Sequence, residues 1–269
     1  MTLVVIGPVT KDLVIIGEQK YQKVGGATYY QSFVFEKFYK DYLAIVNCSD
    51  SELVNDFPNS DKVKVVLKDD THYFENRYPF EDNRDIRKQS SNFADIPILK
   101  SDLENILPDE IDGFVLNPLN RYDFPFETID YLKSFDVPIF ISIQGFLRVP
   151  DVEVNGMHEL KLTYFDKLSQ ILEGVNSIFL DEFEKSIIGD GFDVDEMVIT
   201  NGSHGSRIVS DGEVKIDAVK CDDVVDTTGC GDTYMAAYIS KRIIDTSIEK
   251  SGRFASKVAA EKLKCLGHY

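Results

Sequence analysis

A run of seven residues from Asp226 to Asp232, DTTGCGD, combines two glycines with two carboxylates directly before a stretch of helical apolar periodicity. Glycine lets the backbone approach a phosphate closely, and the free amide groups and positive dipole end of a helix N-terminus hold negative charge. Asp232 follows the second glycine and is placed to accept a hydroxyl proton. The run therefore predicts a site that handles a transferring phosphoryl group.

The helix expected after this run is supported by Met235, Ile239 and Ile243, which recur at four-residue intervals and make one apolar stripe. Asp232 then lies in the first helical turn. Two other phosphate-binding motifs do not fit, because GxxxxGK[ST] is absent and GxGxxG would need glycine where Tyr234 stands. The alternative is a glycine loop that only caps a structural helix, for which one polar residue would suffice.

The run resembles the C-terminal signature of the ribokinase-like (PfkB) carbohydrate kinases, whose usual form is DTxGAGD, and departs from it at Cys230. The resemblance implies a backbone anion hole over Gly229, Cys230 and Gly231. It also implies that Asp232 is the general base that activates the acceptor hydroxyl, a role whose loss lowers a rate by roughly 10²- to 10⁴-fold.

Short apolar, β-branched runs alternate along the chain with segments of helical period. This alternation predicts an α/β fold with three αβα layers, in which a doubly wound, mostly parallel sheet forms one domain over residues 1–269. Strands are expected at 3–6, 43–46, 63–67, 114–116, 139–143, 178–180 and 197–199, and helices at about 28–40, 126–134, 158–172 and 182–188. Residues 206–210 and 213–216 read as a β-hairpin with a two-residue turn.

Two segments, about 11–24 and 68–94, do not fit the alternation. Long irregular segments in compact domains are often functional, for example as lids. Ribokinase-like kinases carry a small sheet that covers the acceptor site and often forms dimer contacts, so the resemblance implies a β lid here and allows a homodimer through it. A mobile surface insertion is the alternative.

Acceptor-binding residues are expected near the N-terminus and after a central strand. Asp12 follows the first strand, where ligands gather in open α/β sheets, and the pair Gly25-Gly26 matches the family's N-terminal signature. The following residues depart from the ribokinase form, which has asparagine where Tyr30 stands, and resemble the inositol-kinase branch more closely. Gln144 and Arg148 also resemble that branch and could reach the acceptor or its lid; packing or surface roles are the alternative.

A pair of carboxylates, Asp181 and Glu184, follows the strand that ends near Leu180. Hard oxygen ligands of this kind suit Mg²⁺, usually through its waters. The family has NxxE at this place, so Glu184 matches and Asp181 replaces asparagine. An acidic first helical turn, favoured by the helix dipole, is the alternative.

The donor side is expected in the loop that starts with Thr200 and contains Gly202 and Gly205, which resembles the family's nucleotide-side loop. Asp226 and Thr228 of the signature are assigned to the same side, and residues 251–266 would flank adenine in the family. The resemblance implies ATP and Mg²⁺ as cofactors and leaves a monovalent cation open. The alternative is that the Thr200 loop is only a glycine turn that leads into the following hairpin.

Composition limits the partners. The net charge of −17 argues against nucleic acid and acidic membrane surfaces, which need clustered Lys and Arg. The four cysteines form no CxxC pair and predict free thiols; Cys230 either fills a small-residue position or reacts readily at a helix N-terminus. The N-terminus lacks a basic region or cleavage site, so we expect a cytoplasmic protein.

The sequence thus predicts an ATP-dependent carbohydrate kinase that phosphorylates a hydroxyl of a small, inositol-like or other sugar or polyol. A nucleoside kinase of the same fold is one alternative. A phosphorylated sugar is disfavoured as acceptor, because few basic residues occur in the proposed acceptor region. A non-catalytic sensor that binds a sugar or nucleotide is a second alternative, against which the presence of Asp232 and Glu184 argues.

Overall fold

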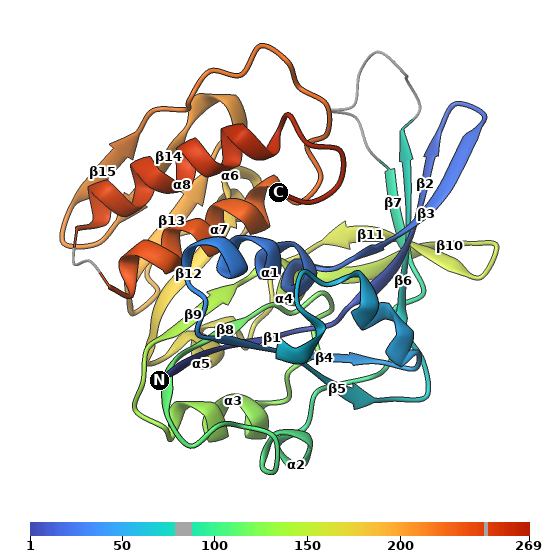
Figure 1. Cartoon of the computed structure of the whole chain (residues 1–269), viewed down its shortest axis with the longest axis horizontal. Coiled ribbons are helices and arrows are strands. Elements are labelled where there is room, and N and C mark those ends of the chain that lie inside the picture. The colour runs from blue at the N-terminus through green and yellow to red at the C-terminus, as the bar shows by residue number, and fades with distance from the viewer. Residues whose placement is uncertain (79–87, 245–246) are drawn as a thin grey trace.

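The computed structural model of the chain describes residues 1–78, 88–244 and 247–269 (Figure 1). Its larger sheet has nine described strands, and all neighbours pair in parallel except the two pairs at one edge, β13–β14 and β14–β15. In spatial order they are β15 (Glu213–Ile216), β14 (Ser206–Val209), β13 (Val194–Thr200), β12 (Val175–Asp181), β9 (Ile139–Ser142), β8 (Ile111–Leu116), β1 (Thr2–Ile6), β4 (Tyr42–Cys48) and β5 (Val63–Leu67). Each strand expected from the sequence is present.

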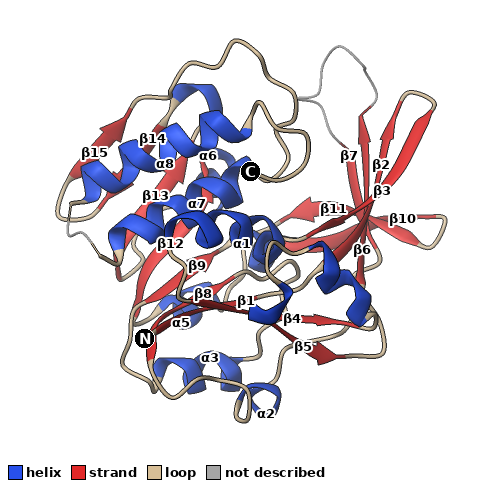
Figure 2. Cartoon of the chain, in the orientation of Figure 1, coloured by secondary structure: helices blue, strands red, loops and turns tan. Residues whose placement is uncertain are grey.

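Helices cover both faces of this sheet (Figure 2). One face packs against α1 (Ala27–Phe38), α7 (Cys230–Arg242) and α8 (Ile248–Lys262), and the other against α2 (Lys100–Leu103), α3 (Phe126–Lys133), α5 (Leu168–Leu172) and α6 (Glu182–Ile188). Strand β1 shows why both faces are apolar, since Leu3 and Val5 enter one core and Val4 and Ile6 enter the other. The predicted three-layer, mostly parallel α/β fold is confirmed.

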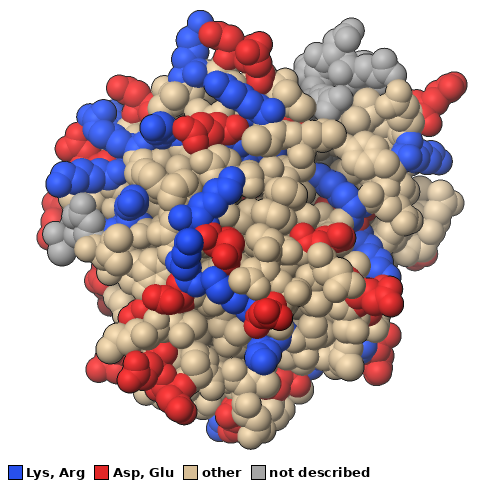
Figure 3. All heavy atoms as spheres, in the orientation of Figure 1, with Lys and Arg blue, Asp and Glu red and all other residues tan. Residues whose placement is uncertain are grey.

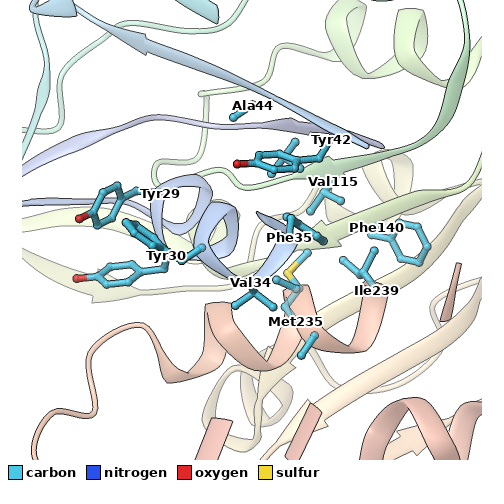
Figure 4. Packing of buried hydrophobic residues seen from close by; sticks show 14 of the residues in the cluster. Tyr29, Tyr30, Val34, Phe35, Tyr42, Ala44, Val115, Phe140, Met235 and Ile239 are labelled. Carbon is cyan, nitrogen blue, oxygen red and sulfur yellow. The ribbon is translucent and has the colours of Figure 1, made fainter. Parts of the chain in front are cut away.

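One hydrophobic core joins α1 and α7 to the large sheet. Val34 and Phe35 of α1 pack with Met235 and Ile239 of α7 (Figure 4). Beneath them, the amides of Gln31 and Asn117 exchange two hydrogen bonds of 2.8 Å in a fully buried setting. Because buried amides must be paired, this pair fixes α1 relative to the end of β8.

A second sheet stands beside the carboxyl ends of the large one (Figure 1). Its six described strands lie in the order β10 (Arg148–Val154), β11 (Met157–Leu162), β7 (Lys88–Ser91), β6 (His72–Tyr78), β2 (Thr10–Ile16) and β3 (Gln19–Gly25). The two irregular segments of the sequence supply β2, β3, β6 and β7, although 79–87 of the second segment lie outside the described residues.

Two local predictions are wrong. The helix expected at 158–172 begins only at Leu168, because residues 157–162 pair with β10 and β7 as strand β11. The turn Asn155-Gly156, with φ of 55° and 77°, joins β10 to β11 and is the hairpin signal that the sequence contained. The β14–β15 hairpin pairs Val209 with Glu213, so its loop has three residues (210–212) rather than two.

Acidic and basic side chains are interspersed on the face shown in Figure 3. The excess negative charge is therefore not gathered into one patch on that face. No helix among the described residues is long and apolar enough to cross a membrane.

Candidate active site

A cavity of about 610 Å³ lies between the carboxyl ends of the large sheet and the second sheet. It brings together most of the residues that the sequence singled out: Asp12, Gly26, Gln144, Arg148, Asp181, Glu184, Thr200, Gly202, Thr228, Gly229, Cys230, Gly231 and Asp232. Gly25, Gly205 and Asp226 are not among its wall residues. Gly25 and Asp226 each contact a wall residue, Asp12 and Thr228 respectively, and Gly205 packs against Ile216.

The wall nearest the expected phosphate site is the N-terminus of α7. Gly229 is its N-cap with φ 76°, in the left-handed region, and Asp232 lies in the first turn. The amide of Cys230 donates to the Thr227 carbonyl oxygen at 3.2 Å, so this amide is already used within the loop. The first amides of a helix lack intrahelical acceptors, which leaves Gly229 and Gly231 as the better-placed donors to an anion.

Gly229 is fixed by a contact that the sequence did not reveal. A Cβ at this position would lie 2.6 Å from Tyr30 Cδ1. Tyr30 itself lines the cavity, is buried, and has a hydroxyl group without a hydrogen-bond partner among the described residues. Burial raises the pKa of Tyr30, and the nearby charges of Asp12, Asp226 and Asp232 raise it further, so the hydroxyl remains protonated and can donate.

Asp12 lies on β2 of the second sheet and is 7% exposed. The Thr10 hydroxyl donates to its Oδ1 at 2.6 Å, and Asn76 Nδ2 donates to its Oδ2 at 3.5 Å. The paired strand β3 places Gly25 against the carboxylate, where a Cβ would be 2.6 Å from Asp12 Oδ2. Gly25 therefore makes room for Asp12, which faces the cavity.

Side chains from the second sheet continue as a hydrogen-bonded chain along the cavity wall. Gln89 Nε2 donates to Asn76 Oδ1 at 2.9 Å, and Arg148 Nη2 reaches Gln89 Oε1 at 3.4 Å. Arg148 also donates to Gln144 Oε1 at 2.6 Å, and its guanidinium lies 5.5 Å from the Phe74 ring centroid. The sequence assigned Gln144 and Arg148 to the site. Phe74 and Asn76 lie in a stretch, residues 71–76, that also resembles the inositol-kinase branch, but neither they nor Gln89 were assigned to the site, because they lie near Arg148 only in space.

Asp181 and Glu184 form a reciprocal capping box at the start of α6. The Asp181 amide donates to Glu184 Oε2 at 2.9 Å, and the Glu184 amide donates to Asp181 Oδ1 at 2.7 Å. Burial, followed by the charge of Asp181, raises the pKa of Glu184 to about 7. The structural role offered as the alternative is therefore present, and it leaves one oxygen of each carboxylate outside the box.

The remaining oxygens suit a hydrated Mg²⁺, because Mg²⁺ keeps several waters and is bound through few carboxylates plus substrate phosphates. Both side chains line the cavity. No cluster of three or more His, Cys, Asp or Glu side chains that could hold a metal occurs within the described parts of the chain. The donor set therefore fits a metal that arrives with a phosphate-bearing ligand.

The Thr200 loop forms the part of the cavity wall where the donor is expected. The Asn201 amide donates to the Gly205 carbonyl oxygen at 2.8 Å, and a Cβ at Gly205 would lie 2.2 Å from the Ile216 carbonyl oxygen. Gly205 thus packs the loop against β15, while Thr200 and Gly202 face the cavity.

The thiol of Cys230 is poorly suited to nucleophilic chemistry. Burial raises its pKa to about 11, despite the opposing charge of Lys262. The reactive alternative is therefore not favoured, and Cys230 fits the small-residue interpretation. All four cysteines are unpaired, as expected.

The fold is that of the ribokinase-like proteins, and its cavity lies between the glycine-rich N-terminus of α7 and the second sheet. Residues 189–269 match the family described as pfkB family carbohydrate kinase. The fold of the whole chain and this match confirm the resemblance to ribokinase-like (PfkB) kinases that the motifs indicated.

Among curated proteins, a nucleoside kinase of Methanocaldococcus jannaschii is 30% identical over 112 residues, which is 38% of this chain and 37% of that protein. The chain thus matches only about a third of that relative's length.

Two of the solved structures that are similar to the chain show how far the likeness extends. A pyrophosphate-dependent kinase in the ribokinase family, complexed with a pyrophosphate analogue and myo-inositol, has a TM-score of 0.82 at 22% identity and covers 99% of this chain and 96% of its own. Arabidopsis thaliana ribokinase, complexed with ribose and ATP, has a TM-score of 0.71 at 17% identity, covering 99% and 93%.

Proposed function

We propose that this chain transfers the terminal phosphoryl group of ATP to a hydroxyl group of a small sugar or polyol. The observation that carries the proposal is one cavity whose wall contains Asp12 on the acceptor side and Asp232 beside the glycine-rich start of α7. A hydroxyl group held by Asp12 would meet a phosphate held by the helix N-terminus.

The proposed mechanism consists of positioning and electrostatics. Asp12, kept in place by Thr10 and Asn76, orients the acceptor through its hydroxyl groups. Asp232 accepts the proton of the attacking hydroxyl, and the amides of Gly229 and Gly231 stabilise charge on the transferring group, because the Cys230 amide already donates to the Thr227 carbonyl oxygen. Thr200, Gly202 and Thr228 contact the donor phosphates, and Gln144 and Arg148 hold the acceptor end of the cavity.

When bound, Mg²⁺ would neutralise charge on the donor phosphates, with its waters held by Glu184 and Asp181. The second sheet is proposed to act as a lid, because β2 and β6 carry Asp12 and Asn76 to the cavity. A homodimer through this sheet remains a proposal.

Two variants of the activity deserve a direct test. The relative from Methanocaldococcus jannaschii is a nucleoside kinase, which makes a nucleoside the second candidate acceptor. Pyrophosphate is the second candidate donor, because a pyrophosphate-dependent kinase shares the fold. The cavity wall includes Thr200 and Gly202 but no described residue of α8, so pyrophosphate, which carries no nucleoside, would also fit as donor.

The test is an assay of all donor and acceptor combinations. ATP and pyrophosphate are each combined with myo-inositol, ribose, a hexose and inosine, and formation of the phosphorylated acceptor is measured. We expect ATP with a polyol or sugar to give the fastest turnover. If both substrates bind in calorimetry but no combination is turned over, the non-catalytic sensor replaces the kinase.

A further inference from the structure

The ammonium group of Lys262 is completely buried behind the phosphate-binding loop. Lys262 is the last residue of α8 and is 0% exposed. Its Nζ donates to the Asp226 carbonyl oxygen at 2.9 Å and, more weakly, to the Cys265 carbonyl oxygen at 3.5 Å. Asp226 Oδ2 lies 3.7 Å away. A cation is thus surrounded by oxygens from two segments of chain.

Two of these three oxygens belong to Asp226, the residue that starts the glycine-rich run. Asp226 Oδ1 accepts from the Thr228 amide at 2.9 Å, and Asp226 Oδ2 accepts from the Gly267 amide at 3.1 Å. The amides of Val225 and Asp226 donate to the Leu263 carbonyl oxygen at 2.8 and 3.3 Å. The C-terminal segment therefore clamps the loop directly before Thr228 and Gly229.

A buried ammonium is costly unless its charge is matched. Asp226 supplies the match: burial would raise the pKa of its carboxyl, but the Thr228 amide and the Lys262 ammonium outweigh burial and hold that pKa below its usual value. The same positive charge acts on Cys230, one residue after Gly229. The positive charge of Lys262 therefore acts on Asp226 in the loop and on Cys230 at the start of α7.

We propose that Lys262 is a tethered cation that sets the conformation of the phosphate-binding loop, in the way that a bound monovalent cation would, so that phosphoryl transfer by this chain needs no added K⁺ or NH₄⁺. The inference rests on the proposed function. Lys262 is a positioning residue, since it does not line the cavity and acts through Asp226.

The experiment compares three variants. Lys262→Ala leaves a hole that a small cation can enter, Lys262→Met removes the charge but fills the volume, and Lys264→Ala removes an exposed lysine of the same segment as a matched control. Phosphoryl transfer is measured with KCl, NH₄Cl or choline chloride at constant ionic strength. Melting temperatures are recorded in the same salts.

Wild type and Lys264→Ala should show equal rates in all three salts. Lys262→Ala should fall by roughly 100-fold in choline, as expected for a displaced catalytic loop, and recover about 10-fold or more in K⁺ or NH₄⁺. Lys262→Met should fall and not recover. A role confined to general stability would give no selective recovery by small cations.

The inference is overturned if the wild type requires K⁺ or NH₄⁺, if Lys262→Ala is as active as the wild type, or if Lys262→Met recovers as well as Lys262→Ala. If no donor and acceptor pair is turned over, the proposed function fails separately. The melting temperatures then decide: selective stabilisation of Lys262→Ala by K⁺ or NH₄⁺ supports the tethered cation, and its absence overturns it. If neither variant folds, the salt dependence of the wild type decides.

Discussion

The ring of Tyr30 packs directly on the backbone of Gly229, close enough that a Cβ at position 229 would lie 2.6 Å from Tyr30 Cδ1. Tyr30 belongs to α1, which follows the acceptor-side strand β3, and Gly229 caps α7. The contact therefore couples α1, next to the proposed acceptor side, to the N-terminus of α7, which is proposed to bind phosphate. The contact could not be predicted from the sequence, because Tyr30 and Gly229 are far apart along the chain.

Gly229→Ala is expected to destabilise the fold and abolish most activity. The variant places a methyl group against the Tyr30 ring at φ 76°, and the left-handed conformation costs about 1–2 kcal/mol while overpacking adds about 1–3 kcal/mol. Chemical denaturation and a phosphoryl-transfer assay measure the two effects.

The matched control is Gly231→Ala, because a Cβ there has no neighbour within 4 Å. Its free energy of unfolding should stay near that of the wild type. Adding Tyr30→Ala to Gly229→Ala should recover part of the overpacking energy. Equal destabilisation by Gly229→Ala and Gly231→Ala would contradict the contact.

Substitutions of Asp232 and Asp12 should change different kinetic parameters. Asp232→Asn removes the proposed base, so kcat should fall by about 10²- to 10⁴-fold with little change in the acceptor KM. Asp12→Asn should mainly raise the acceptor KM, by about 10- to 100-fold, because a hydrogen bond to a charged group contributes roughly 1.5–3 kcal/mol. Steady-state kinetics with the best acceptor decide; a wild-type kcat for Asp232→Asn would rule out its role.

Glu184 should make stability depend on pH. Because the folded-state pKa is raised to about 7 from 4.5, the folded protein binds the extra proton between these values, and stability falls as pH rises through them. The full effect is on the order of 3 kcal/mol, using 1.36 kcal/mol per pKa unit.

Glu184→Gln stays neutral and keeps an acceptor for the Asp181 amide. Its free energy of unfolding, relative to wild type, should therefore rise by about 2–3 kcal/mol from pH 5 to pH 8. Denaturant titrations at both pH values measure this difference. A difference that does not change with pH would show that the Glu184 pKa is not raised.

Tyr30→Phe tests the unpartnered hydroxyl. A buried hydroxyl without a partner costs about 1–3 kcal/mol, so the free energy of unfolding should not fall. The acceptor KM should rise by about 10-fold, which corresponds to one lost hydrogen bond. An unchanged KM for every acceptor would exclude this hydroxyl from acceptor binding.

Local patterns predicted the large sheet well, because parallel strands buried on both faces are continuous apolar runs. Residues 3–6 and 43–46, for example, lie within β1 and β4. The prediction was wrong at 158–172, where β11 lies next to the edge strand β10 and is half-buried along most of its length, so it has no continuous apolar run. Its pairing with β7, from residues 88–91, joins segments far apart in the sequence.

The sequence by itself determined the glycine-rich helix start that is proposed to bind phosphate, because the glycines, the start of α7 and the carboxylate are all encoded within Asp226–Asp232. Likewise, it placed Asp12 and Glu184 after strand ends. Only the tertiary structure decided what stands behind these residues: Tyr30 against Gly229, Gly25 against Asp12, and Lys262 beneath Asp226. Such contacts depend on how α1, α8 and the second sheet pack, and packing between distant segments leaves no local pattern in the chain.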